Sequence, residues 1–315
     1  MDRVLPWGYT TIQWFQAYRS PFLDSLFLFL SFLGEEFFYL LVIPGLYWLV
    51  SRRFALRFAV LLLVSVWVND LLKIIADQPR PSVDRVDVLG DITSGGFPSG
   101  HAQNAVVTWG LVAWRWRAPE MVTAMFILIL GIGVSRVYLG LHFPHDVLAG
   151  WAVGAGLLYL AIRAGPPLEG WGAERKLSVQ MATGLAVVAV LLLIHRGDLA
   201  LRAGGALAGI SVGAPLEWAR VRFLPPLGAR RKMWAFLLGT TVALVIWFGA
   251  RAAFFFLGEA GVFLRYAAVG VWITLGAPWL FVTLRLARRR EGSGEGDGKG
   301  EGAGDRVGDS AATRS

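Results

Sequence analysis

The chain has 315 residues, of which 56% are hydrophobic and 17% charged, and its formal net charge is +8. A soluble globular protein rarely reaches this hydrophobic fraction, whereas an integral membrane protein with many spans reaches it naturally. The chain contains no cysteine, which excludes disulfides, thiolate catalysis and cysteine-ligated metal sites. Its basic residues fall in short clusters between apolar runs, which indicates loops facing anionic lipid headgroups and argues against nucleic acid as a partner.

The N-terminal segment, residues 1–20, mixes aromatic with polar side chains and lacks the apolar core of a signal peptide. We expect it to form an amphipathic helix at the membrane interface, with Trp7, Trp14 and Phe15 at headgroup depth. A poorly ordered N-terminus is the alternative.

Ten apolar runs follow, and most have the roughly 20 residues that a helix needs to cross a bilayer core. They cover residues 21–34, 37–51, 55–76, 102–116, 119–140, 145–164, 178–195, 199–217, 233–251 and 262–286. The first run is short and contains Asp24, so it is the weakest span. The sequence therefore predicts an all-α, polytopic transmembrane bundle of about ten spans. The spacing of Gly150 and Gly154 predicts close packing between two of its helices.

The distribution of basic residues predicts the orientation. Alternate loops collect Arg52, Arg53, Arg115, Arg117, Arg175, Lys176, Arg230 and Arg231, and the positive-inside rule places that side in the cytoplasm. Ten crossings of an inner (plasma) membrane put both termini on this side. If the first short run does not cross, the N-terminus moves to the other side. Residues 291–315 are almost free of apolar side chains, so we expect a disordered cytoplasmic tail.

Three polar segments lie on the opposite, non-cytoplasmic side. "LLKIIADQPRP" supplies Lys73 and Arg80, "GGFPSGHAQN" supplies Ser99, Gly100 and His101, and "SRVYLGLHFPHD" supplies Arg136, His142 and Asp146.

The residue types in these segments indicate a phosphate site. Lys73, Arg80 and Arg136 place three cations in an apolar bundle, where a bound anion is their natural partner. Arginine matches phosphate oxygens two at a time, and lysine adds a point charge. Ser99 and Gly100 immediately precede a helical run, so their backbone N–H groups should form an anion site at a helix N-terminus.

His142 and Asp146 are four residues apart at the start of a helical run, and therefore lie on one helix face. The carboxylate can hold one ring nitrogen of His142 and leave the other free to attack phosphorus. His101, on another loop, remains to protonate a leaving oxygen. The combination predicts phosphoryl transfer through a phosphohistidine.

The pattern Lys-x6-Arg-Pro, Pro-Ser-Gly-His and Ser-Arg-x5-His-x3-Asp resembles the type 2 phosphatidic acid phosphatase (PAP2) superfamily, which shares its site with vanadium haloperoxidases. The resemblance implies a six-helix catalytic core over residues 21–164. It implies His142 as nucleophile, Asp146 as its orienting partner and His101 as general acid. Lys73, Arg80, Ser99, Gly100 and Arg136 would bind phosphate, without a metal or another cofactor. The resemblance assigns no role to the additional transmembrane helices, residues 165–290.

Simpler interpretations exist for single residues. Lys73 could neutralise Asp70, three residues earlier on the same helix, Arg136 could be an interfacial anchor, and His142 could cap a helix. Several other polar residues receive no catalytic role: we expect a solvated turn at Glu35 and Glu36, local hydrogen bonding or exposure for His145, and an ordinary loop at His195.

The favoured function is hydrolysis of a lipid phosphate or diphosphate on the extracytoplasmic face. Family knowledge makes an isoprenoid diphosphate such as undecaprenyl diphosphate the first choice, ahead of phosphatidic acid and related lipids. A lipid phosphotransferase is one alternative. Another is a lipid transporter or scramblase with a vestigial phosphatase site. The oligomeric state is left open.

Overall fold

The computed structural model describes residues 4–90 and 94–290, so the expected tail lies outside the described residues. Its first seven helices are α1 (Val4–Gln16), α2 (Pro21–Phe32), α3 (Glu36–Leu49), α4 (Arg52–Ala76), α5 (Gly100–Trp116), α6 (Pro119–Tyr138) and α7 (Pro144–Ala173). The later helices are α8 (Leu177–Ile194), α9 (Asp198–Leu216), α10 (Ala229–Ala253), α11 (Glu259–Val271) and α12 (Ala277–Thr283). Short π-helical or 3-10 turns cover Glu217–Val221, Phe255–Leu257 and Trp272–Gly276. The strands β1 (Phe223–Leu224) and β2 (Arg288–Arg289) pair antiparallel, with Phe223 opposite Arg289.

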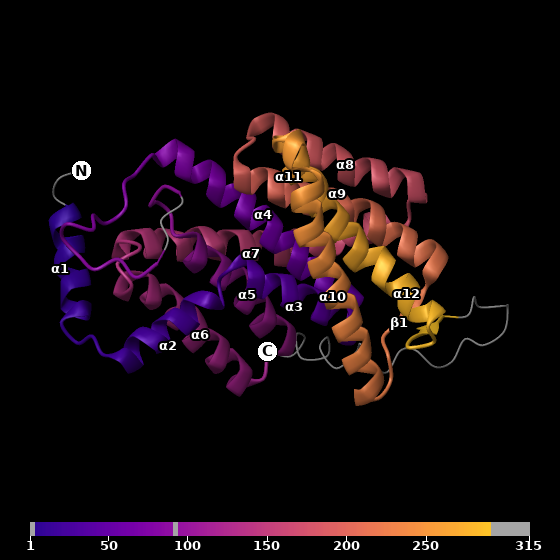
Figure 1. Ribbon diagram of the computed structural model, residues 1–315, viewed down its shortest axis with the longest axis horizontal. Coiled ribbons are helices and arrows are strands. Elements are labelled where there is room, and N and C mark those ends of the chain that lie inside the picture. The colour runs from indigo at the N-terminus through magenta and orange to yellow at the C-terminus, as the bar shows by residue number, and fades with distance from the viewer. Residues whose placement is uncertain (1–3, 91–93, 291–315) are drawn as a thin grey trace, which may run out of the picture.

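The predicted all-α transmembrane bundle is confirmed: long helices run side by side along the length of the molecule (Figure 1). Within the described residues, seven helices are long and apolar enough to cross a membrane. The pair α2–α3, bent by 54°, would count as an eighth span, and α5, with 17 residues, is shorter than the other core spans. The span count is below ten because three of the apolar runs form helices of only 12, 14 and 17 residues.

Helices α2 and α3 cross the bundle once between them. The Asp24 carboxylate on α2 accepts a hydrogen bond of 2.6 Å from the Tyr138 hydroxyl, near the motif loops. Tyr47 on α3 lies beside Glu217, which pairs with Arg52 at the start of α4. The break between the two helices, at Gly34 and Glu35, therefore lies inside the bundle.

The N-terminal helix α1 lies at the end of the bundle that carries the motif loops. Gln16 Nε2 donates to the carbonyl oxygen of Asp87 at 2.6 Å, and the Tyr9 ring packs edge-on against Phe143 with ring centroids 5.1 Å apart. Strand β2, near the last described residue, is at the other end (Figure 1). The two ends of the described chain therefore lie at opposite ends of the bundle. The cytoplasmic position of both termini stays a prediction, and this arrangement matches the alternative in which the first short run does not cross.

Polar contacts tie the helices after α7 to the core. Arg52 Nη1 lies 2.8 Å from the buried Glu217 carboxylate at one end of the bundle. At the motif end, Arg202 Nη1 lies 2.9 Å from Glu36 Oε2. Because a buried charge needs a partner, the Arg52–Glu217 pair fixes how the end of α9 sits against α4, and the half-exposed Arg202–Glu36 pair adds a weaker contact between α9 and α3.

Close helix approaches depend on glycine. The predicted packing at Gly150 and Gly154 is confirmed: an added Cβ would lie 2.5 Å from the Ser99 carbonyl oxygen and 2.7 Å from that of Gln103, respectively. In the C-terminal helices, a Cβ at Gly209 of α9 would overlap the carbonyl oxygen of Ala267 on α11. These contacts are the small-residue packing common between membrane helices.

Gly209→Ala is therefore expected to destabilise the protein by about 1–3 kcal/mol, because the added methyl group forces α9 away from α11. The thermal midpoint of detergent-purified protein should fall. Gly156→Ala is the matched control, since nothing lies within 4 Å of a Cβ built there. An equal midpoint for the two variants would contradict the packing assigned to α9 and α11.

Candidate phosphate-binding active site

The three predicted motifs meet at one end of the bundle. Six of the predicted site residues line one cavity of about 690 Å³: Lys73, Arg80, Gly100, His101, Arg136 and His142. The other two, Ser99 and Asp146, lie behind the residues that line this cavity. The Ser99 amide donates to the Asp146 carbonyl oxygen at 2.9 Å, and the Asp146 side chain contacts His142.

The turn before α7 positions His142 and Asp146. Asp146 Oδ2 accepts a 2.9 Å hydrogen bond from the Phe143 amide and lies 3.3 Å from His142 Nδ1. The carboxylate therefore caps the helix and orients the imidazole together, as the spacing of four residues predicts. With Nδ1 held by Asp146, Nε2 is the nitrogen left for attack. The interpretation of His142 as only a capping residue is wrong.

His142 is 1% exposed and lies in the loop between α6 and α7. Burial, followed by the positive charges of Arg80, Arg136 and Lys73, lowers the pKa of His142 well below its ordinary value. The imidazole is therefore neutral, with the lone pair that a nucleophile needs.

His145 makes the local contacts expected of it. Its Nε2 lies 3.2 Å from Asp146 Oδ1, and its ring stacks on Phe143 with an interplanar angle of 10°. It therefore supports the far side of the carboxylate that orients His142.

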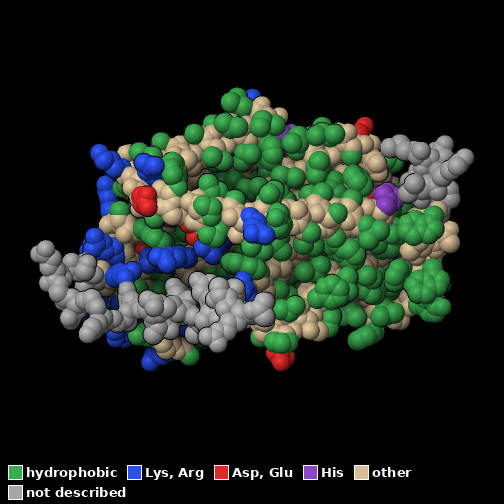
Figure 2. Space-filling view, turned by 180° about the vertical axis from the view of Figure 1, so that it is seen from behind, with side chains coloured by type: hydrophobic (Ala, Val, Ile, Leu, Met, Phe, Trp, Pro, Cys, Tyr) green, Lys and Arg blue, Asp and Glu red, His purple; other side chains and the backbone are tan. Residues whose placement is uncertain are grey.

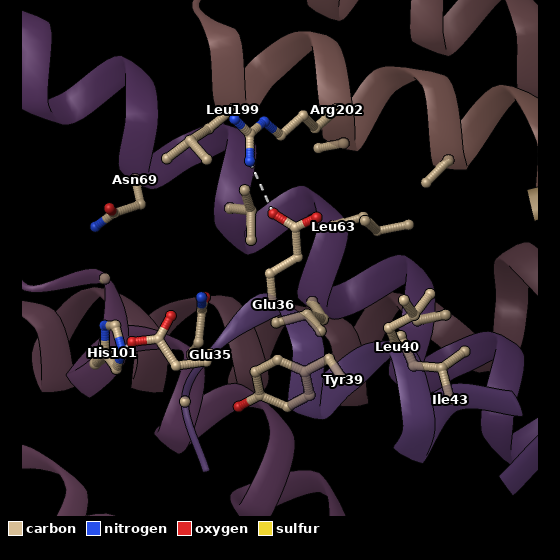
Figure 3. A pocket seen from close by; sticks show the side chains of 18 of the residues that line it. Glu35, Glu36, Tyr39, Leu40, Ile43, Leu63, Asn69, His101, Leu199 and Arg202 are labelled. Atoms are coloured by element: carbon tan, nitrogen blue, oxygen red, sulfur yellow. Dashed lines mark hydrogen bonds and ion pairs between the residues drawn. The ribbon is translucent and has the colours of Figure 1, made fainter. Parts of the chain in front are cut away.

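His101 has a carboxylate partner that the sequence did not identify. Its Nε2 lies 3.1 Å from Glu35 Oε1, at the break between α2 and α3 (Figure 3). Gly34 makes this approach possible, because a Cβ there would lie 2.6 Å from His101 Cδ2. The neighbouring Glu36 pairs with Arg202. The two glutamates lie exposed in a turn, as expected, but each also has a partner that the sequence did not identify. The sequence signal that could have indicated this contact is the pair of adjacent glutamates on the same predicted side of the membrane as the motifs.

Lys73 and Arg80 are held by neutral groups. Lys73 Nζ donates to Ser94 Oγ at 2.8 Å and to the Gly95 carbonyl oxygen at 2.9 Å. Arg80 Nε donates to the Ser94 carbonyl oxygen at 2.8 Å, and its Nη1 to the Leu141 carbonyl oxygen at 2.9 Å. Ser94 thus orients both cations without neutralising either, a role that no motif indicated.

Asp70 has other partners than Lys73. Its Oδ2 lies 2.9 Å from His195 Nε2 and accepts a hydrogen bond of 3.1 Å from the Ala200 amide. Lys73 is therefore not the direct partner of Asp70, although the Asp70 charge still acts on it. The expectation of an ordinary loop at His195 is wrong, because His195 is buried against α4.

Arg136 is only 5% exposed, which rules out a role as an interfacial anchor. Its Nη1 donates to Ser31 Oγ. Within the described part of the chain, its Nε has no hydrogen-bond partner, and neither does the fully buried Ser99 Oγ. Buried polar atoms are normally satisfied, so the Nε of Arg136, which lines the cavity, is a donor available to an anion bound there.

A buried polar network supports the loop before α5. Asn69 Nδ2 donates to the Pro98 carbonyl oxygen at 3.2 Å and to Gln103 Oε1 at 3.0 Å. A Cβ at Gly100 would lie 2.8 Å from Asn69 Oδ1, so only glycine fits at this helix start. In the described residues, no group of three or more histidine, aspartate, glutamate or cysteine side chains is arranged to hold a metal ion.

Comparison with known proteins agrees with this geometry. Residues 54–168 match the family model of the PAP2 superfamily, and residues 201–289 match the transmembrane extension of PAP2 superfamily phosphatases. The chain belongs to the PAP2 superfamily. The first match carries all eight predicted site residues, and the second covers α9 to α12 of the extension.

Three relatives show the range of named activities in the superfamily. Dihydrosphingosine 1-phosphate phosphatase YSR3 of Saccharomyces cerevisiae is 31% identical over 47% of this chain and 40% of its own length. Glucose-6-phosphatase 3 of Bos taurus is 28% identical over 56% of this chain and 57% of its own. Undecaprenyl-diphosphatase of Sulfolobus acidocaldarius is 28% identical over 45% of this chain and 70% of its own. The chain thus spans about half the length of the first two relatives.

The site geometry predicts that inorganic phosphate stabilises the folded protein. A ligand that binds only the folded state raises the thermal midpoint as its concentration increases. Arg136→Gln should abolish most of this increase, because it removes the buried donor that lacks a partner. Arg196→Gln, an exposed residue of the loop between α8 and α9, should keep it. Equal phosphate-dependent shifts in both variants would contradict the assigned anion site.

Proposed function

We propose that this protein is a membrane phosphatase that hydrolyses a lipid phosphate or diphosphate through a phosphohistidine. The observation that carries the proposal is the shared cavity: His142, His101 and three cations occupy one end of it, and mainly apolar side chains line the rest. A substrate with a phosphate and an apolar chain matches that division. The named activities of the relatives, on phosphorylated lipids and on a sugar phosphate, support the reaction class.

The reaction would proceed in two steps. His142 Nε2 attacks phosphorus while the bond to the leaving oxygen breaks, and His101 donates a proton to that oxygen. Water then attacks the phosphohistidine, His101 accepts its proton, and free phosphate leaves. Lys73, Arg80 and Arg136 stabilise charge on the three non-bridging oxygens throughout.

In this scheme Glu35 is a positioning residue for His101. Its contact with His101 can hold the imidazole in one orientation and fix its tautomer. The Glu35–His101 contact resembles the Asp146–His142 contact, but its two residues come from separate segments of the chain.

We place the active site on the extracytoplasmic face of an integral inner membrane. The surface of the molecule is largely apolar, and Lys and Arg side chains gather toward one end (Figure 2). Basic loops that include Arg52, Arg117 and Arg230 lie at the end opposite the motif loops, and such loops normally stay in the cytoplasm. In this orientation the N-terminal helix shares the outer face with the site.

The presence of His142 as a candidate nucleophile favours hydrolysis over transport. A transporter or scramblase needs cations to bind a headgroup but has no need of a buried, oriented His142. Transfer of the phosphoryl group to a second lipid would use the same first step. In the second step, the acceptor lipid would take the place of water.

His142→Ala is expected to abolish phosphate release, a loss of at least about 10⁴-fold in kcat, because no nucleophile remains. The assay uses detergent-purified protein without added metal. The panel is phosphatidic acid, sphingosine 1-phosphate, undecaprenyl diphosphate and glucose 6-phosphate. His145→Ala, next to the same carboxylate, should keep most of the activity. A folded wild-type protein that releases no phosphate from any substrate would favour phosphotransfer or transport.

Glu35→Gln is expected to lower kcat by about tenfold to a hundredfold on an alkyl phosphate, because the general acid loses its orienting carboxylate. On nitrophenyl phosphate, whose leaving group needs little protonation, the loss should be much smaller. A purely structural role would reduce both rates equally, so the ratio of the two rates is the measurement. Glu259→Gln, an exposed glutamate at the start of α11, is the matched control.

A further inference from the structure

The cavity that holds the site continues far beyond it. At one end lie Lys73, Arg80 and His142; at the other lie Tyr47 and Thr274. Tyr47 belongs to the opposite end of the bundle, where its hydroxyl donates to the Thr274 carbonyl oxygen at 3.3 Å. The cavity therefore runs along the helices and does not stop at the phosphate site.

Helix α3 lines the full length of this cavity. Glu36, Leu40, Ile43 and Tyr47 all face it, at the spacing of one helix face. Figure 3 shows Leu40 and Ile43 at the end away from His101 and Asn69. The distance from Glu36 to Tyr47 is about 16 Å at about 1.5 Å per residue. This is close to half of the roughly 30 Å thickness of a bilayer core, the depth of one leaflet.

The opposite wall belongs to the extension. Ala203, Ala206 and Ile210 of α9, with Val269 and Ile273 of the α11 segment, complete the lining. The small side chains of α9 leave space there, whereas its glycines pack on α11. Neither half of the chain forms this apolar space alone.

Two polar contacts between the core and the extension limit the width of the cavity. The Glu36–Arg202 ion pair joins α3 to α9 near the catalytic end, as Figure 3 shows, and the Tyr47–Thr274 contact joins α3 to the extension at the far end. The whole space, catalytic end included, is about 690 Å³, within the range of about 300–1,000 Å³ typical of pockets for one small ligand.

We propose that the extension and the core together form a binding site for one unbranched alkyl chain, and that the substrate is a single-chain lipid phosphomonoester. The phosphate lies between Lys73, Arg80 and Arg136, and the chain passes Leu40 and Ile43 toward Tyr47. This proposal deepens the proposed phosphatase function and rests on it. It disfavours an isoprenoid diphosphate, whose branched chain is far longer than the depth of this pocket.

The first experiment compares kcat/KM for hexadecyl phosphate and butyl phosphate. Ala206→Trp fills the extension wall, Leu40→Trp fills the core wall, and Ala186→Trp, on an exposed face of α8, is the control. The ratio of the long to the short substrate should fall at least about tenfold in each pocket variant, equivalent to about 1.4 kcal/mol. In the control it should stay within about twofold of wild type.

The second experiment does not depend on turnover. A hexadecyl phosphonate with a diazirine near the end of its chain is photolysed with wild-type protein, and the labelled peptides are mapped by mass spectrometry. Labels should fall on α3, α9 and α11, and Ala206→Trp should remove them.

The outcomes separate the two proposals. Unchanged substrate ratios in both active pocket variants, or labels confined to lipid-facing positions of α6 and α8, would overturn the chain-binding site and leave the phosphatase function standing. Labelling of the pocket without phosphate release from either substrate would support the chain-binding site and overturn hydrolysis. A wild-type preference for dipalmitoyl phosphatidic acid over hexadecyl phosphate would overturn the single-chain assignment.

Discussion

The central constraint on this molecule is a set of three cations held inside an apolar bundle, none of which forms a direct ion pair with a carboxylate among the described residues. Lys73 and Arg80 are satisfied by Ser94 and by carbonyl oxygens, and Arg136 retains an unpaired buried donor. Dipoles orient a cation but do not cancel its charge, so the site stays electropositive until an anion enters. The neutral state of His142 follows from the same field, because a protonated imidazole there would add a further positive charge.

The two histidines differ in how they are positioned. His142 and Asp146 lie within one helix turn, so the geometry of α7 alone sets their contact. His101 and Glu35 come from different segments, and their contact depends on how the α2–α3 break docks against α5. The predicted nucleophile, His142, is therefore positioned by local structure, and the predicted general acid, His101, by tertiary packing.

This difference explains what could be predicted from the sequence. The helices, the glycine contacts at Gly150 and Gly154, and the His142–Asp146 pair depend on local spacing, which sequence shows directly. Partners such as Ser94 for Lys73, Glu35 for His101 and His195 for Asp70 lie far apart in the chain and carry no spacing signal. The bend of 54° between α2 and α3 is likewise set by tertiary packing, and the sequence indicated only that the first of these two short runs is a weak span. The cavity wall contributed by α9 required the docking of the extension, which no motif describes.

The bond between Asp70 and His195 also bears on whether the catalytic half could work as an isolated fragment. Asp70 lies one turn before Lys73 on α4, and its carboxylate is occupied by His195 and the Ala200 amide, both supplied by the segment that begins the extension. A fragment ending after α7 would leave that carboxylate without these partners, three residues from Lys73. The free anion would then be able to pair with Lys73 and reduce the positive charge of the predicted phosphate site. The residues after α7 therefore influence the electrostatics of that predicted site, although they carry none of its motifs.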